Sequence, residues 1–288
     1  MNLASNIYNL TQPSQKVTRT TLLRKLLFGY IILSFFQLIP LIDTLYNPQQ
    51  SLIATQSLHQ FTVTTCVNLL SVDAFKNYYL VFIAVQVIAA FVGLMGFFPR
   101  IMTFIVFFVT LNLQNRIYST LTGGDYLLCL MLFYLSFISD GRKSKNKYVQ
   151  EITNVSDHTF ILLCQLQLVI VYAVSAIYKW QSVEWTQGIA LQKILLINEY
   201  SIPYLQNMVC EFPVVFKLFT WMALLYQTLF PVLIFSKRLK KYVIITGIIF
   251  HLFIAIAMGL FNFSLVMICC YALFYDVKLK QEEEHHHH

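Results

Sequence analysis

Long runs of apolar residues limit most strongly what this chain can fold into. Eight such runs occur, over residues 22–41, 78–97, 101–113, 126–139, 160–178, 214–235, 242–258 and 261–275. A helix needs about 20 mostly apolar residues to cross the hydrocarbon core of a bilayer. Several of the runs are shorter, so their flanks must contribute to a crossing. We therefore predict an all-α fold, a polytopic integral membrane bundle of about eight transmembrane helices.

The scarcity of charge supports the same class. Charged residues make up 11% of the chain and hydrophobic residues 58%, whereas a soluble domain carries roughly 25% charged residues. A soluble enzyme is therefore excluded. The net charge of +7 does not indicate nucleic-acid binding, because the basic residues fall in short clusters between apolar runs. The predicted partner is the lipid bilayer.

The distribution of the basic residues predicts the orientation. With the N-terminus inside and eight crossings, 15 of the 20 Lys and Arg residues fall on the cytoplasmic side, as the positive-inside rule requires. Both termini are then cytoplasmic. We divide the chain into a cytoplasmic segment (1–20), a transmembrane domain (21–276) and a cytoplasmic tail (277–288), whose Glu and His run resembles an affinity tag.

The last two apolar runs require a break between them. As one helix, residues 242–275 would be about 51 Å long, much longer than the hydrocarbon core. We predict a turn near Gly259 and Asn262. Two outer segments are long, 42–77 and 180–213. The second has the apolar spacing of an interfacial amphipathic helix, with a re-entrant segment as the alternative.

The six cysteines show neither a CxxC pair nor the spacing of metal ligands, and we predict no metal site. Cys66 and Cys210 both fall in outer segments. The sequence leaves open whether these two residues form a disulfide.

Unusual polar residues collect at the outer ends of the predicted spans, where an ionisable group at membrane depth is costly unless it is paired or functional. The residues concerned are Arg116, Asp125, Lys179, Glu184, Trp185 and Asn262, together with His251 inside the seventh run. We predict a shared cavity walled by the third, fourth, fifth and seventh runs.

Each of these residues also has a structural interpretation. Lys179 either snorkels to the interface or serves as a base. Asp125 either caps a helix or acts as a catalytic carboxylate. Arg116 is an interface anchor, a partner of Asp125 or a substrate clamp. His251 is a hydrogen-bonded core histidine or a proton carrier.

Three blocks in order resemble a known family. The sequences VYAVSAIYKW (171–180) and EWTQG (184–188) resemble the segment that bears the catalytic lysine of vitamin K-dependent gamma-carboxylases, which belong to the horizontally transferred transmembrane (HTTM) family. GGDYLLCLMLFYLSF (123–137) is similar to a polar-start span of this family, and FHLFIAIAMGLFNFSLVM (250–267) to its late helices. The resemblance covers roughly residues 20–275.

The resemblance implies an enzyme that acts on a lipid quinol. In the carboxylases, a lysine deprotonates reduced vitamin K, oxygen converts the quinol to an epoxide, and the base formed removes a proton from a peptide glutamate. The matching residue is Lys179. We therefore predict Lys179, Asp125 and His251 as catalytic, Arg116, Glu184, Trp185 and Asn262 as substrate-binding, and a reduced quinone resembling vitamin K hydroquinone as cofactor.

The chain departs from the carboxylases in two respects. It has Gly124 where they have a histidine, and no large lumenal domain follows its last apolar run, so peptide carboxylation is not carried over. By length it resembles more closely the bacterial sporulation-delaying-protein B type, which helps to mature a secreted antimicrobial peptide. We expect action at the extracytoplasmic side of a bacterial inner membrane on a quinol, a secreted peptide or both, with a small accessory protein as partner. The alternative is a non-catalytic factor for maturation, export or immunity of a peptide toxin.

Overall fold

The computed structural model describes residues 13–49, 69–71, 75–140 and 145–275. Every regular element in this part of the chain is a helix, which confirms the all-α prediction. Each of the eight apolar runs lies mostly within one of eight longer helices. These are α2 (Pro13–Leu38), α4 (Tyr79–Leu94), α5 (Pro99–Arg116), α6 (Gly123–Ser136), α7 (Lys147–Gln181), α11 (Pro213–Leu233), α12 (Lys240–Met258) and α13 (Phe261–Cys270).

Among the described residues, four helical stretches are long and apolar enough to cross a membrane, which indicates a membrane protein. They are Arg19–Tyr46, Lys147–Gln181, Pro213–Leu233 and Lys240–Met258. The first joins α2 to η1 (Ile39–Leu41) and α3 (Ile42–Tyr46). Shorter apolar helices are Tyr79–Leu94, Gly123–Ser136 and Phe261–Phe274, the last of which includes η7 (Tyr271–Phe274).

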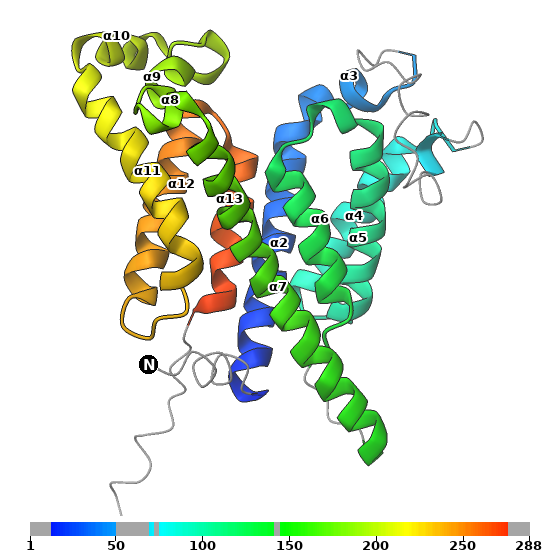
Figure 1. Cartoon of the computed structure of the whole chain (residues 1–288). Coiled ribbons are helices and arrows are strands. Elements are labelled where there is room, and N and C mark those ends of the chain that lie inside the picture. Colours follow the sequence, from blue (N-terminus) through cyan, green and yellow to red (C-terminus); the bar gives the residue numbers. More distant parts are fainter. Residues whose placement is uncertain (1–12, 50–68, 72–74, 141–144, 276–288) are drawn as a thin grey trace, which may run out of the picture.

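The helices form two groups joined by α7 and α13 (Figure 1). One group holds α2, α4, α5 and α6, and the other holds α11 and α12. α7 packs on α11 and on α6, while α13 packs on α12, α6 and α2. The first described turns of α2 and the end of η7 lie at the same end of the molecule (Figure 1). Arg19 Nε donates a hydrogen bond of 2.7 Å to the Tyr275 carbonyl there.

α7 starts well before its apolar run. Asn146 caps it by accepting a hydrogen bond of 3.0 Å from the backbone N–H of Tyr148. This satisfies one of the donors that a helix start leaves free, so the polar stretch before residue 160 continues as helix. α2 likewise begins at Pro13, ahead of the run at 22–41.

The turn predicted near Gly259 and Asn262 is confirmed at Gly259, whereas Asn262 lies in the first turn of α13. α12 ends at Met258, Gly259 adopts a left-handed conformation with φ of 68°, and α13 begins at Phe261. Glycine takes this conformation without steric cost, which makes it a common helix terminator. The chain thus reverses direction and α13 packs back against α12.

The segment over 180–213 forms several short helices rather than one. These are α8 (Val183–Thr186), α9 (Ala190–Leu195), η6 (Asn198–Tyr200) and α10 (Pro203–Glu211). Leu191, Leu195 and Val209 pack with Phe216 of α11. This helical cap therefore sits on the end of α11 (Figure 1). The remaining described short elements are η4 (Leu69–Ser71) and η5 (Tyr118–Thr120).

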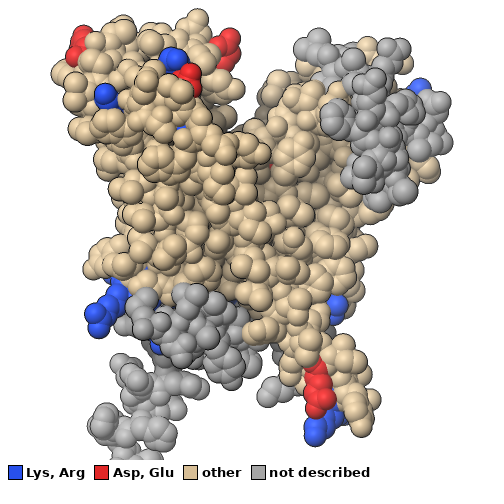
Figure 2. All heavy atoms as spheres, in the orientation of Figure 1, with Lys and Arg blue, Asp and Glu red and all other residues tan. Residues whose placement is uncertain are grey.

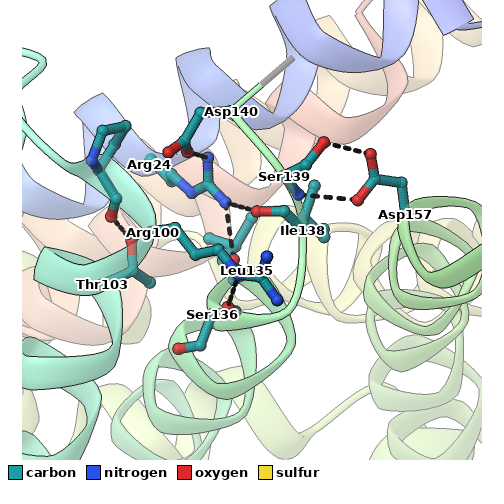
Figure 3. A network of polar contacts seen from close by, with 10 residues as sticks. Arg24, Arg100, Thr103, Leu135, Ser136, Ile138, Ser139, Asp140 and Asp157 are labelled. Carbon is teal, nitrogen blue, oxygen red and sulfur yellow. Dashed lines mark hydrogen bonds and ion pairs between the residues drawn. The ribbon is translucent and has the colours of Figure 1, made fainter. Parts of the chain in front are cut away.

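A network of polar contacts lies around the end of α6 (Figure 3). Arg24 of α2 forms an ion pair of 3.0 Å with Asp140 and donates to the carbonyls of Leu135, at 2.7 Å, and Ile138. Asp157 of α7 accepts a 2.7 Å bond from the Ser139 N–H. These contacts satisfy the free carbonyls at the end of α6 and tie α2, α6 and α7 together.

The surface agrees with a lipid environment. In Figure 2, the charged residues of this face gather at the two ends, and the described middle is uncharged. Large apolar side chains point outward from several helices, with Ile88 62%, Met222 62% and Ile256 73% exposed. An apolar surface of this extent is costly in water and suits the hydrocarbon core.

Candidate functional site

A cavity of about 520 Å³ lies between α7, α11, α12 and α13 and is covered by α8 and α9. Its walls are mainly apolar and aromatic. Nine lining side chains carry a polar group that can bond a ligand or a neighbour, namely Tyr172, Ser175, Lys179, Trp185, Thr220, Tyr226, Gln227, Thr246 and His251. A few polar groups in an apolar hollow are typical of a small-molecule site.

Lys179 lies in the last turn of α7 and is half-buried. Its Nζ donates 2.6 Å to Oε1 of Gln227 on α11 and 3.1 Å to Oγ of Ser175, one turn earlier on α7. The Ser175 hydroxyl also donates to Gln227 Oε1, at 3.1 Å. Within the described residues, no carboxylate pairs with Lys179.

Trp185 of α8 covers the lysine. Its ring centroid lies 4.4 Å from Lys179 Nζ, within the range of a cation–π contact. α8 is held over the cavity because Trp221 Nε1 donates 3.0 Å to the Thr186 carbonyl. Gly188, with φ of 79°, lets the chain turn there, and a Cβ at this position would lie 2.6 Å from Lys217 Cγ.

Four side chains form a buried chain of hydrogen bonds beside the cavity. His251 Nε2 and the Tyr172 hydroxyl are 2.7 Å apart, and the Tyr172 hydroxyl contacts that of Tyr271. The Tyr271 and Tyr226 hydroxyls are 3.1 Å apart, and the Tyr226 hydroxyl donates 3.2 Å to the Val243 carbonyl. This series of hydrogen bonds links the backbone of α12, at Val243, to the His251 side chain through tyrosines of α11, η7 and α7.

Gly247 makes this chain possible. It lies between Val243 and His251 on α12, and a Cβ there would collide with the hydroxyls of Tyr226 and Tyr271. Only glycine leaves room for both hydroxyls against the helix backbone. His251 Nδ1 is buried and has no hydrogen-bond partner.

Asp125 has a structural role at the start of α6. Its Oδ2 accepts 2.7 Å bonds from both the backbone N–H and the hydroxyl of Thr122, and Thr122 and Asp125 form a capping box. Asp125 does not line the cavity. The helix-capping interpretation describes its contacts, and no contact of its carboxylate with Lys179 or His251 supports the catalytic one.

Arg116 also lies outside the cavity lining. It is 5% exposed, and its Nη2 has no hydrogen-bond partner. Arg116 and Asp125, both described, form no ion pair with one another. The structure therefore brings together Lys179, Trp185 and His251, but not Arg116 or Asp125.

Glu184 and Asn262 flank the site without lining it. Glu184 accepts a 2.8 Å bond from the Ser182 hydroxyl and one of 3.4 Å from Lys193. These contacts lower the pKa of the Glu184 carboxyl, chiefly through the Ser182 hydrogen bond. Asn262 is exposed, next to the cavity residue Phe263.

The predicted cavity walls were partly wrong. The fifth and seventh runs line the cavity as predicted, but the sixth and eighth replace the third and fourth. The reason is the close approach of α13 to α6, where a Cβ on Gly124 would lie 2.7 Å from the Phe263 Cα. α13 therefore stands between α6 and the cavity. A histidine has no room at Gly124.

Gln227 and the three tyrosines were not predicted from the sequence as site residues. Gln227 is a lone amide inside the apolar run 214–235, which was a usable signal because polar groups at membrane depth need partners. Ser175 is four residues before Lys179 and shares its helix face. The tyrosines gave no such signal, since tyrosine is common along this chain.

Apolar and aromatic side chains form most of the cavity wall, with a few polar groups among them. No group of three or more His, Cys, Asp or Glu able to hold a metal occurs among the described residues. Cys210 is exposed on α10, while Cys66 lies outside the described residues.

Comparison with known proteins identifies no relative. The chain matches no family model, no curated protein and no solved structure.

Proposed function

We propose that this chain is a membrane enzyme of the HTTM type that binds a lipid quinol in the cavity and uses Lys179 as general base. The main support for the proposal is the environment of the Lys179 amine. Lys179 Nζ lines a largely apolar cavity and is held by Gln227 and Ser175, which are both neutral.

The direction of the side chain argues against snorkelling. A snorkelling lysine extends from the helix end toward the headgroups. Lys179 instead bonds Ser175, one turn deeper in α7, and Gln227 in the facing helix. Its amine is therefore turned toward the cavity. Charged groups at membrane depth that serve only structure are usually paired, and no carboxylate is paired with this one within the described residues.

The residues fit a quinol. The aromatic and apolar walls would hold the ring and the first part of its tail, and Trp185 above Lys179 would exclude water. A quinol, when bound, supplies two electrons and two protons to an oxidant such as oxygen. Lys179 Nζ would take a hydroxyl proton, and Gln227 Oε1 and Ser175 Oγ would hold the resulting ammonium in place.

We place the cavity at the extracytoplasmic side of a bacterial inner membrane. It is covered by the end of the molecule that carries α8 to α10, opposite the starts of α2 and α7 (Figure 1). The basic clusters of the sequence adjoin those starts and the connection between α11 and α12, and the positive-inside rule assigns such clusters to the cytoplasm.

The test compares Lys179→Arg and Lys179→Ala with wild type in lipid nanodiscs. The probe is a naphthohydroquinone with a short prenyl tail, and oxygen uptake is measured. Arginine stays protonated, so both variants should lose about 10²–10⁴-fold in rate, the usual contribution of a general base. Lys193→Arg and Lys217→Arg, at the same end of the molecule, should retain the wild-type rate.

Two outcomes would overturn the proposal. Full activity of Lys179→Arg would leave the lysine a structural role. Failure of the wild-type protein to bind or oxidise the hydroquinone would favour the alternative, a non-catalytic factor for a secreted peptide.

A further inference from the structure

Four of the residues that line the cavity are also exposed at the surface of the molecule. They are Phe219 and Met222 on α11, and Thr246 and Ile249 on α12. Met222 is 62% exposed and Ile249 63%. The lining residues of the other elements, α7 and α13 among them, are all buried or half-buried. The cavity therefore opens between α11 and α12, and we call the gap between these four residues the lateral opening.

Contacts between α11 and α12 limit the height of the lateral opening. On the side of the cap, the rings of Phe219 and Phe253 have their centroids 6.3 Å apart. On the other side, the Tyr226 hydroxyl donates to the Val243 carbonyl. From Phe219 to Tyr226 the axis of α11 advances about 10 Å, and Met222 lies within this stretch. The opening is thus about two helical turns high.

The depth of the lateral opening is that of the hydrocarbon core. Met222 is the tenth of the 21 residues of α11, and Ile249 is the tenth of the 19 residues of α12. Both helices are long and apolar enough to cross a membrane. They lie on the side of the molecule away from α2, α4, α5 and α6 (Figure 1). The opening therefore faces the acyl chains at the middle of the bilayer rather than water.

The side chains around the lateral opening suit an apolar chain. Phe219, Met222 and Ile249 present hydrocarbon and a thioether, and Thr246 is the one hydroxyl residue among the four. The end of the cavity near Lys179 is instead covered by Trp185. Packed helices have axes only about 8–10 Å apart, so a cavity between them cannot hold a long extended tail. Such a tail must leave the cavity, and an apolar path is the least costly.

We propose that the ligand of the cavity carries a long apolar tail, and that this tail passes through the lateral opening into the hydrocarbon core. The inference rests on the proposed function and names the class of quinol that the site accepts, one with a tail of several isoprene units. The ring lies inside, near Lys179, and the tail stays in lipid. Met222 and Ile249 are the residues that contact the tail where it leaves the protein.

Narrowing the opening tests the proposal by binding. Two ligands are compared without oxygen in nanodiscs: a naphthohydroquinone with a tail of several isoprene units, and the same ring with a methyl group in place of the tail. Ile249→Trp puts a larger side chain at the opening. It should weaken binding of the long-tailed ligand by about tenfold or more, as overpacking does, and change binding of the tail-less ligand little.

The ratio of the two affinities is the quantity compared, because partition of the long tail into the bilayer then cancels between variants. Ile256→Trp is the matched control, since Ile256 is exposed on the same helix but does not line the cavity. It should keep the wild-type ratio. Met222→Trp should act like Ile249→Trp from the facing helix, and thermal unfolding checks that each variant is folded.

Photolabelling locates the tail in the wild-type protein. The probe is the long-tailed naphthohydroquinone with a diazirine in the middle of its tail, and labelled peptides are identified by mass spectrometry. Label should fall on outward-facing residues of α11 and α12 beside the opening, such as Leu225 and Ile245. An excess of the tail-less ligand should remove this label, because both ligands occupy the same cavity.

The outcomes separate this inference from the proposed function. An unchanged ratio of affinities in Ile249→Trp and Met222→Trp would overturn the role of the opening. So would label on other helices, or label that the tail-less ligand does not displace, since an ordinary lipid chain would then fill the gap. In each of these cases, loss of turnover in Lys179→Arg would leave the proposed function standing. If neither ligand binds the wild-type protein, both proposals fall.

Discussion

Lys179 and Gln227 show how a site is divided between two distant parts of a chain. Lys179 stands out in the sequence as a charge at the end of an apolar run. Its contact with Gln227 exists only because α7 packs on α11. The Gln227 amide oxygen orients the Lys179 amine without adding a negative charge beside it. A carboxylate in the same place would pair with the ammonium and keep it protonated.

Replacement of the Gln227 amide by a carboxylate tests whether the neutral charge of this side chain matters for turnover. Gln227→Glu keeps the size of the side chain and adds the charge, and the resulting ion pair should lower hydroquinone oxidation by at least about 10²-fold, as loss of the base does. Gln187→Glu, an exposed position beside α8, is the control and should leave the rate unchanged. Wild-type turnover in Gln227→Glu would show that Lys179 need not give up its proton.

At the scale of elements, the packing of α6 on α13 decides where the cavity lies. Gly124 lets the two backbones approach, since a Cβ there would lie 2.7 Å from the Phe263 Cα. We predict that Gly124→Ala lowers the free energy of unfolding by about 1–3 kcal/mol, as overpacking does. Gly123→Ala is the matched control, because its Cβ would meet Phe263 Cε2 at an ordinary 3.8 Å. Thermal unfolding in detergent measures both, and equal stability of the two variants would contradict the packing argument.

The same contact explains what the sequence could and could not predict. Helices and the turn at Gly259 follow from local pattern, because apolar runs and a glycine that can adopt a left-handed conformation carry their own signal. Lys179, Trp185 and His251 could be singled out by residue type and position. The cavity walls could not, because they depend on which helices meet. Arg116 and Asp125 looked equivalent to Lys179 by depth alone, yet α13 separates α6 from the cavity.

For the whole molecule, the arrangement of long and short helices bears on the number of crossings. α6 has 14 residues, about 21 Å of helix, less than the roughly 30 Å of the hydrocarbon core. It packs against α5, α7 and α13, so neighbouring helices cover part of its surface. Short helices that are packed between others in this way can form part of a membrane bundle, while longer helices such as α7, α11 and α12 make most of the contact with lipid.

The crossing of α7 is the point on which the orientation depends. This helix has 35 residues, and it joins the end of the molecule with the Arg24–Asp140 network to the end with the cap (Figure 1). In a variant with the native cysteines replaced, Lys145→Cys and Gln187→Cys should therefore label from opposite sides. A membrane-impermeant maleimide should reach Cys at position 187 in intact cells, and at position 145 only after permeabilisation, because the positive-inside rule predicts that the basic end is cytoplasmic. Labelling of both from one side would mean that α7 does not cross, and reversed labelling would place the cavity on the cytoplasmic side.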